Sequence, residues 1–306
     1  MSENLIPVGV FVADDNRALF ERTIEHNSNV HINDLNRRYP LEIFIGDSPY
    51  IQEVSRGGTR CFVLTEPPEI FSYETNFLDR FDFLAGPKFS YLGERENVIV
   101  SNPIIPFFVG VELPIRRKLN FVTRKLPQFK VNQRMPIVKF SIAELMEFEM
   151  RKTKSISVII SSKRMTPQQI DRINFIKFME RNSKIPLKIY GGLTAPIRDK
   201  YSVLANSTHH IAIENSSHDD YWTEKFADSL LSLNHTFYCG APNLPDYFSN
   251  SVFDMIPLNN FKKSQATIEE SFFNRPVDLV GLRNERTRLI HENSLMGLIR
   301  KILTRI

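Results

Sequence analysis

The second half of the chain alternates short apolar strands with longer amphipathic segments, and this alternation restricts the fold more than any other feature. The predicted strands are β-branched or aromatic runs: SISVIIS (155–161), PLKIYGG (186–192), HHIAIE (209–214) and TFYCG (236–240). Helix-compatible segments lie between them, over 167–182 and 221–233. Strand–helix–strand repeats form a parallel sheet with helices on its faces. We therefore expect an α/β fold.

The segment TPQQIDRINFIKFMERN (166–182) contains the signals of a helix start. Thr166 can be the N-cap residue, Pro167 fits the first helical position, and Gln169 would complete a capping box. Apolar residues then recur at helical spacing. The residues just before Thr166 therefore form a loop that leads from a strand into a helix.

The first half shows the same alternation less clearly. Its strand-like runs are PVGVFVA (7–13), LEIFIG (41–46) and CFVLTE (61–66). Polar, helix-compatible segments separate them, which again indicates an α/β domain. Residues 97–136 are rich in proline, aromatic and basic residues and fit neither element, whereas SIAELMEFEMRK (141–152) resembles a short helix that could join two domains.

Length and charge limit the class of protein. A chain of 306 residues, 42% of them hydrophobic, can form two domains with separate cores. The net charge of +4 and the pI of about 9.0 suit an anionic partner, such as nucleic acid, a nucleotide diphosphate or an anionic membrane. Cys61 and Cys239 lie in apolar runs, which favours free thiols over a disulfide or a zinc site.

The sequence also carries no sign of export or membrane insertion. The first residues, MSENLIPVGVFVADDN, have no basic region followed by a long apolar region, so we expect no signal peptide. No run of eighteen apolar residues suggests a membrane span. We expect a cytoplasmic protein.

The stretch IAIENSSHDDYWTEKF (211–226) places ligand-binding residue types directly after a strand. Ligands of parallel α/β sheets bind in such loops, at the carboxyl ends of strands. Glu224 and Lys225 would stand in the first turn of a helix, where backbone N–H groups favour an anion. Tyr221 offers a ring face and a hydroxyl, and Asn215 and Glu214 can bind sugar hydroxyls. This pattern indicates a nucleotide-sugar pocket, and the alternative is a solvated helix start with a Glu/Lys pair.

A second loop, SSKRMTPQQIDR (161–172), carries the cations Lys163, Arg164 and Arg172. Cations before a helix start suit a diphosphate, and the alternative is a solvated basic loop. His209 and His210 are adjacent in a strand and point to opposite faces, which favours structural or surface roles over a shared metal.

Three further motifs have simpler interpretations. Asp219 and Asp220 are adjacent rather than spaced as a metal-binding D-x-D, and we interpret them as a helix cap. RGGTR (56–60) lacks the length and the lysine of a phosphate-binding loop, so we expect a turn. The basic, amphipathic segment from Gly281 to Ile306 either packs on the body of the protein or lies on an anionic membrane.

The block ENSSHDDYWTEK, followed by a strand and the sequence GAP, resembles the donor-binding motif of glycosyltransferase family 10, the α-1,3/4-fucosyltransferases. Upstream, ISVIISSKRMTPQQIDRINFIKFM and LKIYGG resemble the family's strand, arginine-bearing helix and glycine turn. Bacterial members without a membrane anchor are the most similar. The resemblance extends from Ser155 to Phe261, and FVLTEPPEI (62–70) resembles a strand-plus-acid segment of the family's first domain.

The resemblance implies a GT-B fold, with two Rossmann-like domains facing across a cleft. It places an acceptor-binding domain at 1–145, a nucleotide-sugar-binding domain at 153–270 and a helical segment at 271–306. The implied activity is an inverting, metal-independent transfer of fucose from GDP-fucose to a hydroxyl of a surface glycan such as lipopolysaccharide. No cofactor or nucleic acid is implied, and the basic C-terminal segment could contact the inner face of the cell membrane.

The resemblance also assigns roles to residues of the donor site. Lys225 matches the phosphate-binding lysine. Glu224, Tyr221 and Asn215 match residues that contact the ribose, the diphosphate or the sugar, and Glu214 precedes Asn215 in the same motif. Arg172 matches the phosphate-binding arginine.

Some positions depart from the family pattern. The loop between Ser161 and Arg172 is longer than usual, so Arg164 could replace Arg172. Ser162 stands where asparagine is usual, and Cys239 stands where tryptophan is common. These departures leave open a different nucleotide sugar, or an inactive relative that only binds nucleotide or glycan.

The proposed catalytic base comes from the first domain. Glu66 matches the family's base, and it stands at the end of a strand, before two prolines that end the pairing. Glu69 is the nearest alternative.

Overall fold

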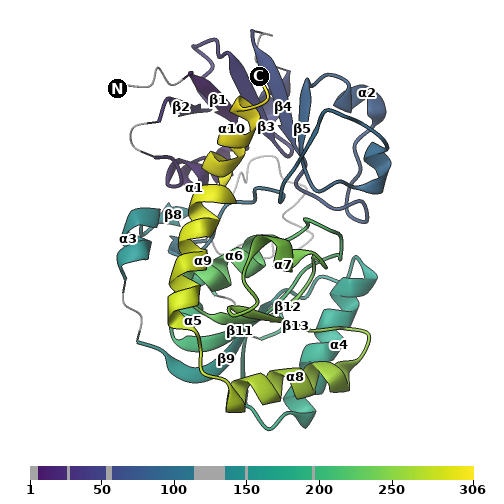
Figure 1. Ribbon diagram of the computed structural model, residues 1–306, viewed down its shortest axis with the longest axis vertical. Coiled ribbons are helices and arrows are strands. Elements are labelled where there is room, and N and C mark those ends of the chain that lie inside the picture. The colour runs from purple at the N-terminus through teal and green to yellow at the C-terminus, as the bar shows by residue number, and fades with distance from the viewer. Residues whose placement is uncertain (1–5, 26–27, 53–56, 114–134, 149–150, 195–196) are drawn as a thin grey trace, which may run out of the picture.

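The computed structural model describes residues 6–25, 28–52, 57–113, 135–148, 151–194 and 197–306. These residues form two α/β bodies, one built on each of two parallel sheets (Figure 1). A small antiparallel pair, β7 (Val111–Glu112) and β8 (Ile137–Val138), lies at the junction. The part of the ambiguous segment over 114–134 lies outside the described residues.

The N-terminal sheet is six-stranded within the described residues, with the order β2-β1-β3-β4-β5-β6 and parallel pairing throughout. Its strands are β1 (Val8–Phe11), β2 (Val30–Ile32), β3 (Leu41–Ile45), β4 (Thr59–Val63), β5 (Phe83–Gly86) and β6 (Val98–Val100). Short helices α1 (Arg17–Glu21) and α2 (Thr75–Leu78) connect some of them. Every residue of β1 and β3 is buried, as expected for strands covered on both faces.

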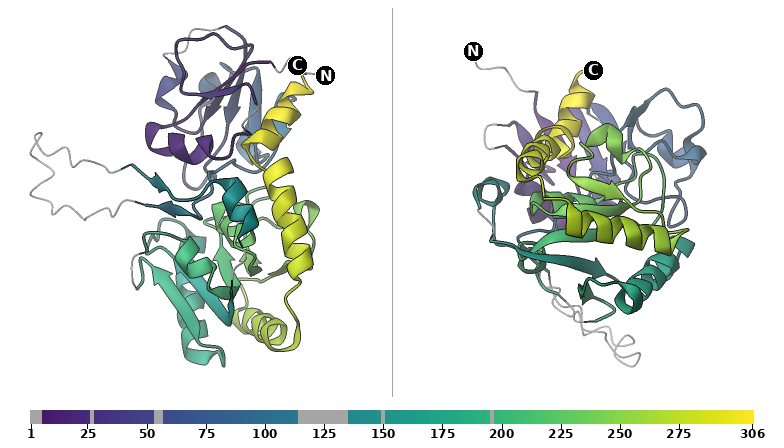
Figure 2. Two further views of the ribbon diagram at one scale, coloured as in Figure 1. Left: turned by 90° about the vertical axis from the view of Figure 1, so that its left-hand side faces the viewer. Right: turned by 60° about the horizontal axis from the view of Figure 1, so that its bottom comes forward.

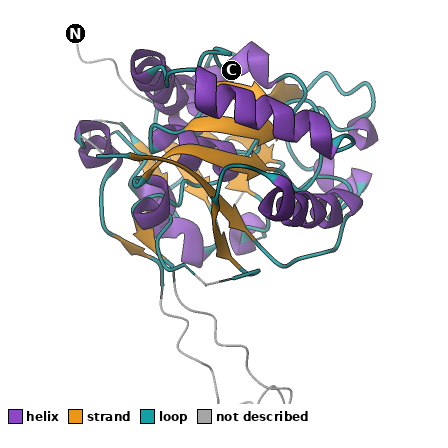
Figure 3. Ribbon diagram, turned by 90° about the horizontal axis from the view of Figure 1, so that it is seen from below, coloured by secondary structure: helices purple, strands orange, loops and turns teal. Residues whose placement is uncertain are grey.

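The C-terminal sheet is five-stranded in the same described part of the chain, with the order β10-β9-β11-β12-β13, all parallel. Its strands are β9 (Thr153–Ile160), β10 (Leu187–Gly191), β11 (Ser207–Ile213), β12 (His235–Cys239) and β13 (Phe253–Met255). Its helices are α4 (Pro167–Asn182), α5 (Tyr201–Leu204), α6 (Glu224–Leu231), α7 (Leu244–Tyr247) and α8 (Phe261–Asn274). Figure 3 shows helices on both sides of the strands, which confirms the predicted α/β architecture.

The start of α6 differs from the sequence prediction. The helix begins at Glu224 rather than Tyr221, and Thr223 is its N-cap. Tyr221 and Trp222 precede it and are both 1% exposed, because their rings fill apolar space beside the sheets. Asp220 does not cap this helix; its carboxylate instead accepts hydrogen bonds from Asn243 Nδ2 at 2.9 Å and Tyr247 Oη at 2.7 Å.

The start of α4 confirms most of its predicted signals. Thr166 Oγ1 accepts from the backbone N–H of Gln169 at 3.1 Å, and Pro167 is the first helical residue. The capping box is not closed as expected, because Gln169 Oε1 accepts from the N–H of Met165 at 2.7 Å, one residue before the N-cap. The loop before α4 is thereby tied to the helix.

The C-terminal segment crosses from one body to the other. Helix α9 (Leu279–Glu292) packs Leu282 and Leu289 into a core that includes α6. Helix α10 (Leu295–Leu303) buries its apolar side in the core of the N-terminal sheet, and Figure 2 shows this continuous path along both bodies. The apolar side of α10 is therefore covered by protein.

The prediction of free thiols is confirmed, and both histidines are buried. Cys61 and Cys239 are free thiols, and burial raises the pKa of Cys239 to about 11. His209 stacks on Phe237 at 5.6 Å, and His210 Nδ1 lies 2.9 Å from Ser157 Oγ. Burial lowers the pKa of both histidines to about 3, consistent with neutral structural side chains.

Candidate active site

A cavity of about 260 Å³ lies at the carboxyl ends of β9 and β11. The strand ends, the loop after β10 and the first turns of α6 supply its walls, as expected for a parallel α/β sheet. Its charged and polar lining consists of Ser161, Lys163, Arg172, Lys200, His210, Asn215, Glu224, Lys225 and Asp228. Both predicted donor loops therefore meet at one cavity. Lys163 is among its lining residues and Arg164 is not, although both side chains are exposed.

Lys225 connects the end of β11 to the start of α6. Its Nζ donates to Glu214 Oε2 and to Thr223 Oγ1, each at 3.0 Å. Glu214 is fully buried and also accepts from the N–H of Thr223 at 2.8 Å. Burial alone would lower the pKa of Lys225, but Glu214 and Glu224 raise it above its ordinary value. The site therefore holds a fixed, charged ammonium at the cavity wall.

Arg172 brings the two predicted loops together. Its Nη1 donates to Asn215 Oδ1 at 2.9 Å, and its Nη2 donates to Ser161 Oγ at 2.8 Å. The residue is 3% exposed, and its buried Nε has no hydrogen-bond partner among the described residues. A buried guanidinium held by two neutral oxygens is a strong electrostatic partner for an anion that enters the cavity.

Glu224 is an ionised carboxylate between two ammonium groups. Its Oε1 lies 3.7 Å from Lys225 Nζ and 3.7 Å from Lys200 Nζ. Burial would raise the pKa of Glu224, but the two lysines, together with hydrogen bonds from Thr223 and from the Glu224 backbone N–H, lower it to about 2. The carboxylate can therefore accept hydrogen bonds across the whole physiological pH range.

Lys200 and Asp228 are members of the site that the sequence analysis missed. Lys200 precedes α5, in the loop after β10, and Asp228 lies one turn into α6. The rule that directed attention to the loops after β9 and β11 applies equally to the loop after β10. Lys200 could have been found in this way, whereas Asp228 carries no signal because it sits inside a helix.

Tyr221 lies apart from the cavity. Its ring is buried in the aromatic cluster of the N-terminal body, with the ring of Phe89 at 6.2 Å. Burial, together with nearby carboxylates, raises the pKa of its hydroxyl. The expected open ring face is covered by protein, so Tyr221 joins the two bodies, and its contact with a donor stays a prediction.

Glu66 lies beyond the end of β4, near enough to Lys225 and Lys163 of the cavity for their charges to act on its carboxyl group. Burial raises the pKa of its carboxyl group, while the charges of Lys225 and Lys163 act in the opposite direction. Glu69 is bound differently: its Oε1 lies 2.9 Å from His218 Nε2 of the donor loop. Glu66 is thus the acid that responds to the cations of the cavity, and Glu69 forms a contact between the two bodies.

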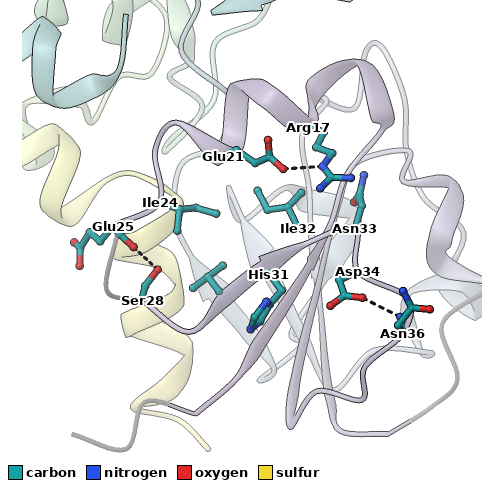
Figure 4. A pocket seen from close by; sticks show the side chains of 11 residues that line it. Arg17, Glu21, Ile24, Glu25, Ser28, His31, Ile32, Asn33, Asp34 and Asn36 are labelled. Atoms are coloured by element: carbon teal, nitrogen blue, oxygen red, sulfur yellow. Dashed lines mark hydrogen bonds and ion pairs between the residues drawn. The ribbon is translucent and has the colours of Figure 1, made fainter. Parts of the chain in front are cut away.

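A larger hollow of about 670 Å³ lies beside β2 and α1, away from these residues (Figure 4). Its carboxylates are occupied locally, since Glu21 Oε1 accepts from Arg17 at 2.7 Å and Asp34 Oδ1 accepts from the N–H of Asn36 at 3.0 Å. It contains none of the predicted site residues. Its size alone does not make it the active site.

Comparisons with known proteins indicate the class of enzyme to which this site belongs. Residues 149–236 match the family model described as "Glycosyltransferase family 10 (fucosyltransferase) C-term". No curated protein sequence matches the chain. The structure of HepE from Anabaena in complex with UDP is similar, with a TM-score of 0.54 and 9% identity, over 98% of this chain and 100% of that chain.

Two further solved structures are similar. A variant of TarM from S. aureus, in a complex that contains UDP, gives a TM-score of 0.50 and 11% identity, over 86% of this chain and 55% of that chain. An α1,3-fucosyltransferase with GDP-fucose gives a TM-score of 0.49 and 16% identity, over 96% of this chain and 84% of that chain.

The fold and the site define a GT-B glycosyltransferase, which confirms the predicted fold class and enzyme class. Residues 149–236 match the model of the C-terminal domain of glycosyltransferase family 10, which confirms the predicted resemblance for that segment.

Proposed function

We propose that the chain transfers fucose from GDP-fucose to a hydroxyl of a surface glycan such as lipopolysaccharide, with inversion and without a metal ion. The observation that carries this proposal is the convergence of Lys225 and Arg172 on one cavity within the segment that matches family 10. Asn215 and Glu224 stand beside them as acceptors for hydroxyl groups.

The cations fit the charge that develops during the transfer. The bond between the sugar anomeric carbon and the diphosphate oxygen breaks, and the electron pair leaves with the diphosphate. Lys225 and Arg172 would stabilise that growing negative charge from fixed positions, in the way that other glycosyltransferases use a metal ion. Glu66, on the opposite body, would take the proton of the acceptor hydroxyl as the new bond forms.

The first test is nucleotide binding by calorimetry, with GDP, UDP and CDP. A charge-assisted phosphate contact is worth about 1.5–3 kcal/mol, so Lys225→Ala should weaken GDP binding about ten- to a hundredfold. Lys177→Ala, at an exposed position of α4 outside the cavity, is the matched control and should bind GDP as the wild type does. Equal affinity of wild type and Lys225→Ala would contradict the assignment.

The preference among GDP, UDP and CDP tests the identity of the donor nucleotide. Ser162 and Cys239 depart from the family pattern, which leaves open one alternative, a transferase that uses another nucleotide sugar. Preference for uridine or cytidine would support that alternative. Nucleotide binding without transfer or slow hydrolysis of any nucleotide sugar would indicate an inactive relative.

A lipid-linked acceptor would bring the chain into contact with the inner face of the cell membrane. None of the helices in the described ranges is long and apolar enough to cross a bilayer. Because the apolar side of α10 is buried, contact would depend on exposed cations near the C-terminus, such as Arg283, Lys301 and Arg305.

Liposome flotation tests this contact. Weak binding to anionic vesicles, lost on neutral vesicles and in the variant Lys301→Glu/Arg305→Glu, is the expected result. Equal flotation of wild type and variant on anionic vesicles would refute a role for this segment.

A further inference from the structure

We propose that Lys200 is a positioning residue of the donor site, which fixes the carboxylate of Glu224 for contact with the donor and is itself fixed by Asp228. This inference rests on the proposed function. Three groups from separate parts of the C-terminal body meet here: Lys200 from the loop after β10, and Glu224 and Asp228 from two turns of α6.

The geometry places Lys200 at the cavity wall, within reach of both Asp228 and Glu224. Lys200 Nζ makes its short contact with Asp228 Oδ2, at 2.8 Å, and lies 3.7 Å from Glu224 Oε1. The second distance is that of an ion pair without a hydrogen bond. The Glu224 carboxylate accepts hydrogen bonds from Thr223 and from its own backbone N–H but none from Lys200, so part of its acceptor capacity is left for a ligand, while the charge of Lys200 holds it in place.

Asp228 is anchored in turn, so Lys200 cannot swing away. The carboxylate of Asp228 is 1% exposed, and its Oδ1 accepts from the N–H of Phe108 at 2.8 Å and of Val109 at 3.3 Å. The ammonium of Lys200 also lies 5.1 Å from the ring centroid of Phe108. Segment 107–109 thus supports the cation that faces the donor site.

Lys200 and Lys225 differ in the exposure of their side chains and in their hydrogen-bond partners. Lys225 has a more exposed side chain, 22% against 15% for Lys200, and it hydrogen-bonds residues of the strand end and helix start. We expect Lys225 to touch the phosphate groups and Lys200 to act through Glu224. Besides Lys200, the charge of Lys225 also lowers the pKa of Glu224. The charge of Glu224 in turn shifts the pKa values of four neighbouring groups, those of Arg172, Glu66, Tyr221 and Asp228.

The first measurement needs no ligand. NMR titration of the Glu224 side-chain carboxyl should show a pKa that rises by about one to three units in Lys200→Met, because a neighbouring opposite charge is lost. Lys200→Arg should restore a low pKa, and Lys177→Met should leave it unchanged. Since Lys200→Met leaves Asp228 buried without its cation and could unfold the protein, Lys200→Met/Asp228→Asn is the second variant. That variant is compared with Asp228→Asn, so that both proteins lack the negative charge of Asp228 and only the charge of Lys200 differs. An equal Glu224 titration in these two folded variants would overturn the proposal.

The second measurement is a double-mutant cycle on GDP binding. Lys200→Met and Glu224→Gln should each weaken binding about three- to tenfold, less than a direct charged contact. If Lys200 acts through Glu224, the variant with both changes should bind no more weakly than Glu224→Gln alone. Additive losses would show that Lys200 touches the donor directly, which would also overturn the proposal.

The two measurements separate this inference from the proposed function. If wild-type protein binds no nucleotide, the proposed function fails, and the carboxyl titration still decides whether Lys200 controls Glu224. If GDP binds and depends on Lys225, but the titration and the cycle show no link between Lys200 and Glu224, only the inference fails.

Discussion

At the scale of single residues, Glu66 decides whether the N-terminal body takes part in the chemistry. Burial raises the pKa of its carboxyl group, and the cavity lysines moderate the shift. A carboxylate of this kind can accept a proton near neutral pH once an acceptor hydroxyl approaches. Glu69 is a poorer candidate, because its hydrogen bond with His218 opposes the effect of burial and lowers its pKa.

We expect Glu66→Gln to bind GDP as tightly as the wild type and to transfer about 10²- to 10⁴-fold more slowly, the usual effect of losing a general base. Transfer to a glycan acceptor and GDP calorimetry measure the two effects separately. Glu69→Gln is the matched control and should stay near the wild-type rate. Full activity of Glu66→Gln would place the base elsewhere.

The residues of the donor site show what a sequence can predict at this scale. Asn215 lies in a loop that follows a strand, and Lys225, Glu224 and Arg172 lie in the first two turns of the helices that such loops enter. The sequence predicts that these residues meet, because the topology brings the carboxyl ends of parallel strands together. The role of Tyr221 was not predictable in this way. Whether an aromatic ring faces a ligand or a neighbouring core depends on the other body, which the local sequence does not describe.

At the scale of elements, α10 is a helix whose partner is far away in sequence. Leu298 and Ile302 are 1% and 0% exposed, and they pack with residues of β1 and β3. The turn before it is tight: a Cβ at Gly297 would lie 2.2 Å from the carbonyl oxygen of Glu292. The last helix is therefore part of the first core.

Leu298→Ala should lower the free energy of unfolding by about 2–5 kcal/mol, the usual cost of a cavity in a packed core. Chemical denaturation measures it, with Lys301→Ala on the exposed side of the same helix as control. A loss below about 0.5 kcal/mol, typical of surface positions, would show that α10 is not packed as described.

Element prediction succeeded where local rules dominate. Four strands of the second sheet, β9 to β12, follow from β-branched or aromatic runs, and the start of α4 follows from Thr166 and Pro167, whereas β13 was not predicted. The amphipathic pattern of the C-terminal segment predicted an apolar face, but it left open whether protein or membrane covers that face. Only the long-range packing of α10 answers that question.

At the scale of the whole molecule, segment 107–109 is held from both bodies. Arg22, at the end of α1, donates to the carbonyl oxygens of Val109 at 2.8 Å and Phe107 at 3.2 Å. Asp228 accepts the N–H groups of the same segment from the C-terminal body. Together with Tyr221 and the crossing of α9 and α10, these contacts connect the two cores.

Because of these contacts we expect the chain to unfold in a single transition, and GDP bound to the C-terminal body should stabilise both bodies. At a GDP concentration 100 times Kd the stabilisation should be about 2.7 kcal/mol.

In Arg22→Met the buried carbonyl oxygens lose their donor, so the N-terminal body should melt earlier and respond less to GDP. Arg17→Met removes an exposed cation of the same helix and should change neither property. Differential scanning calorimetry with and without GDP measures both properties, and two separate wild-type transitions, of which GDP moves only one, would refute the coupling.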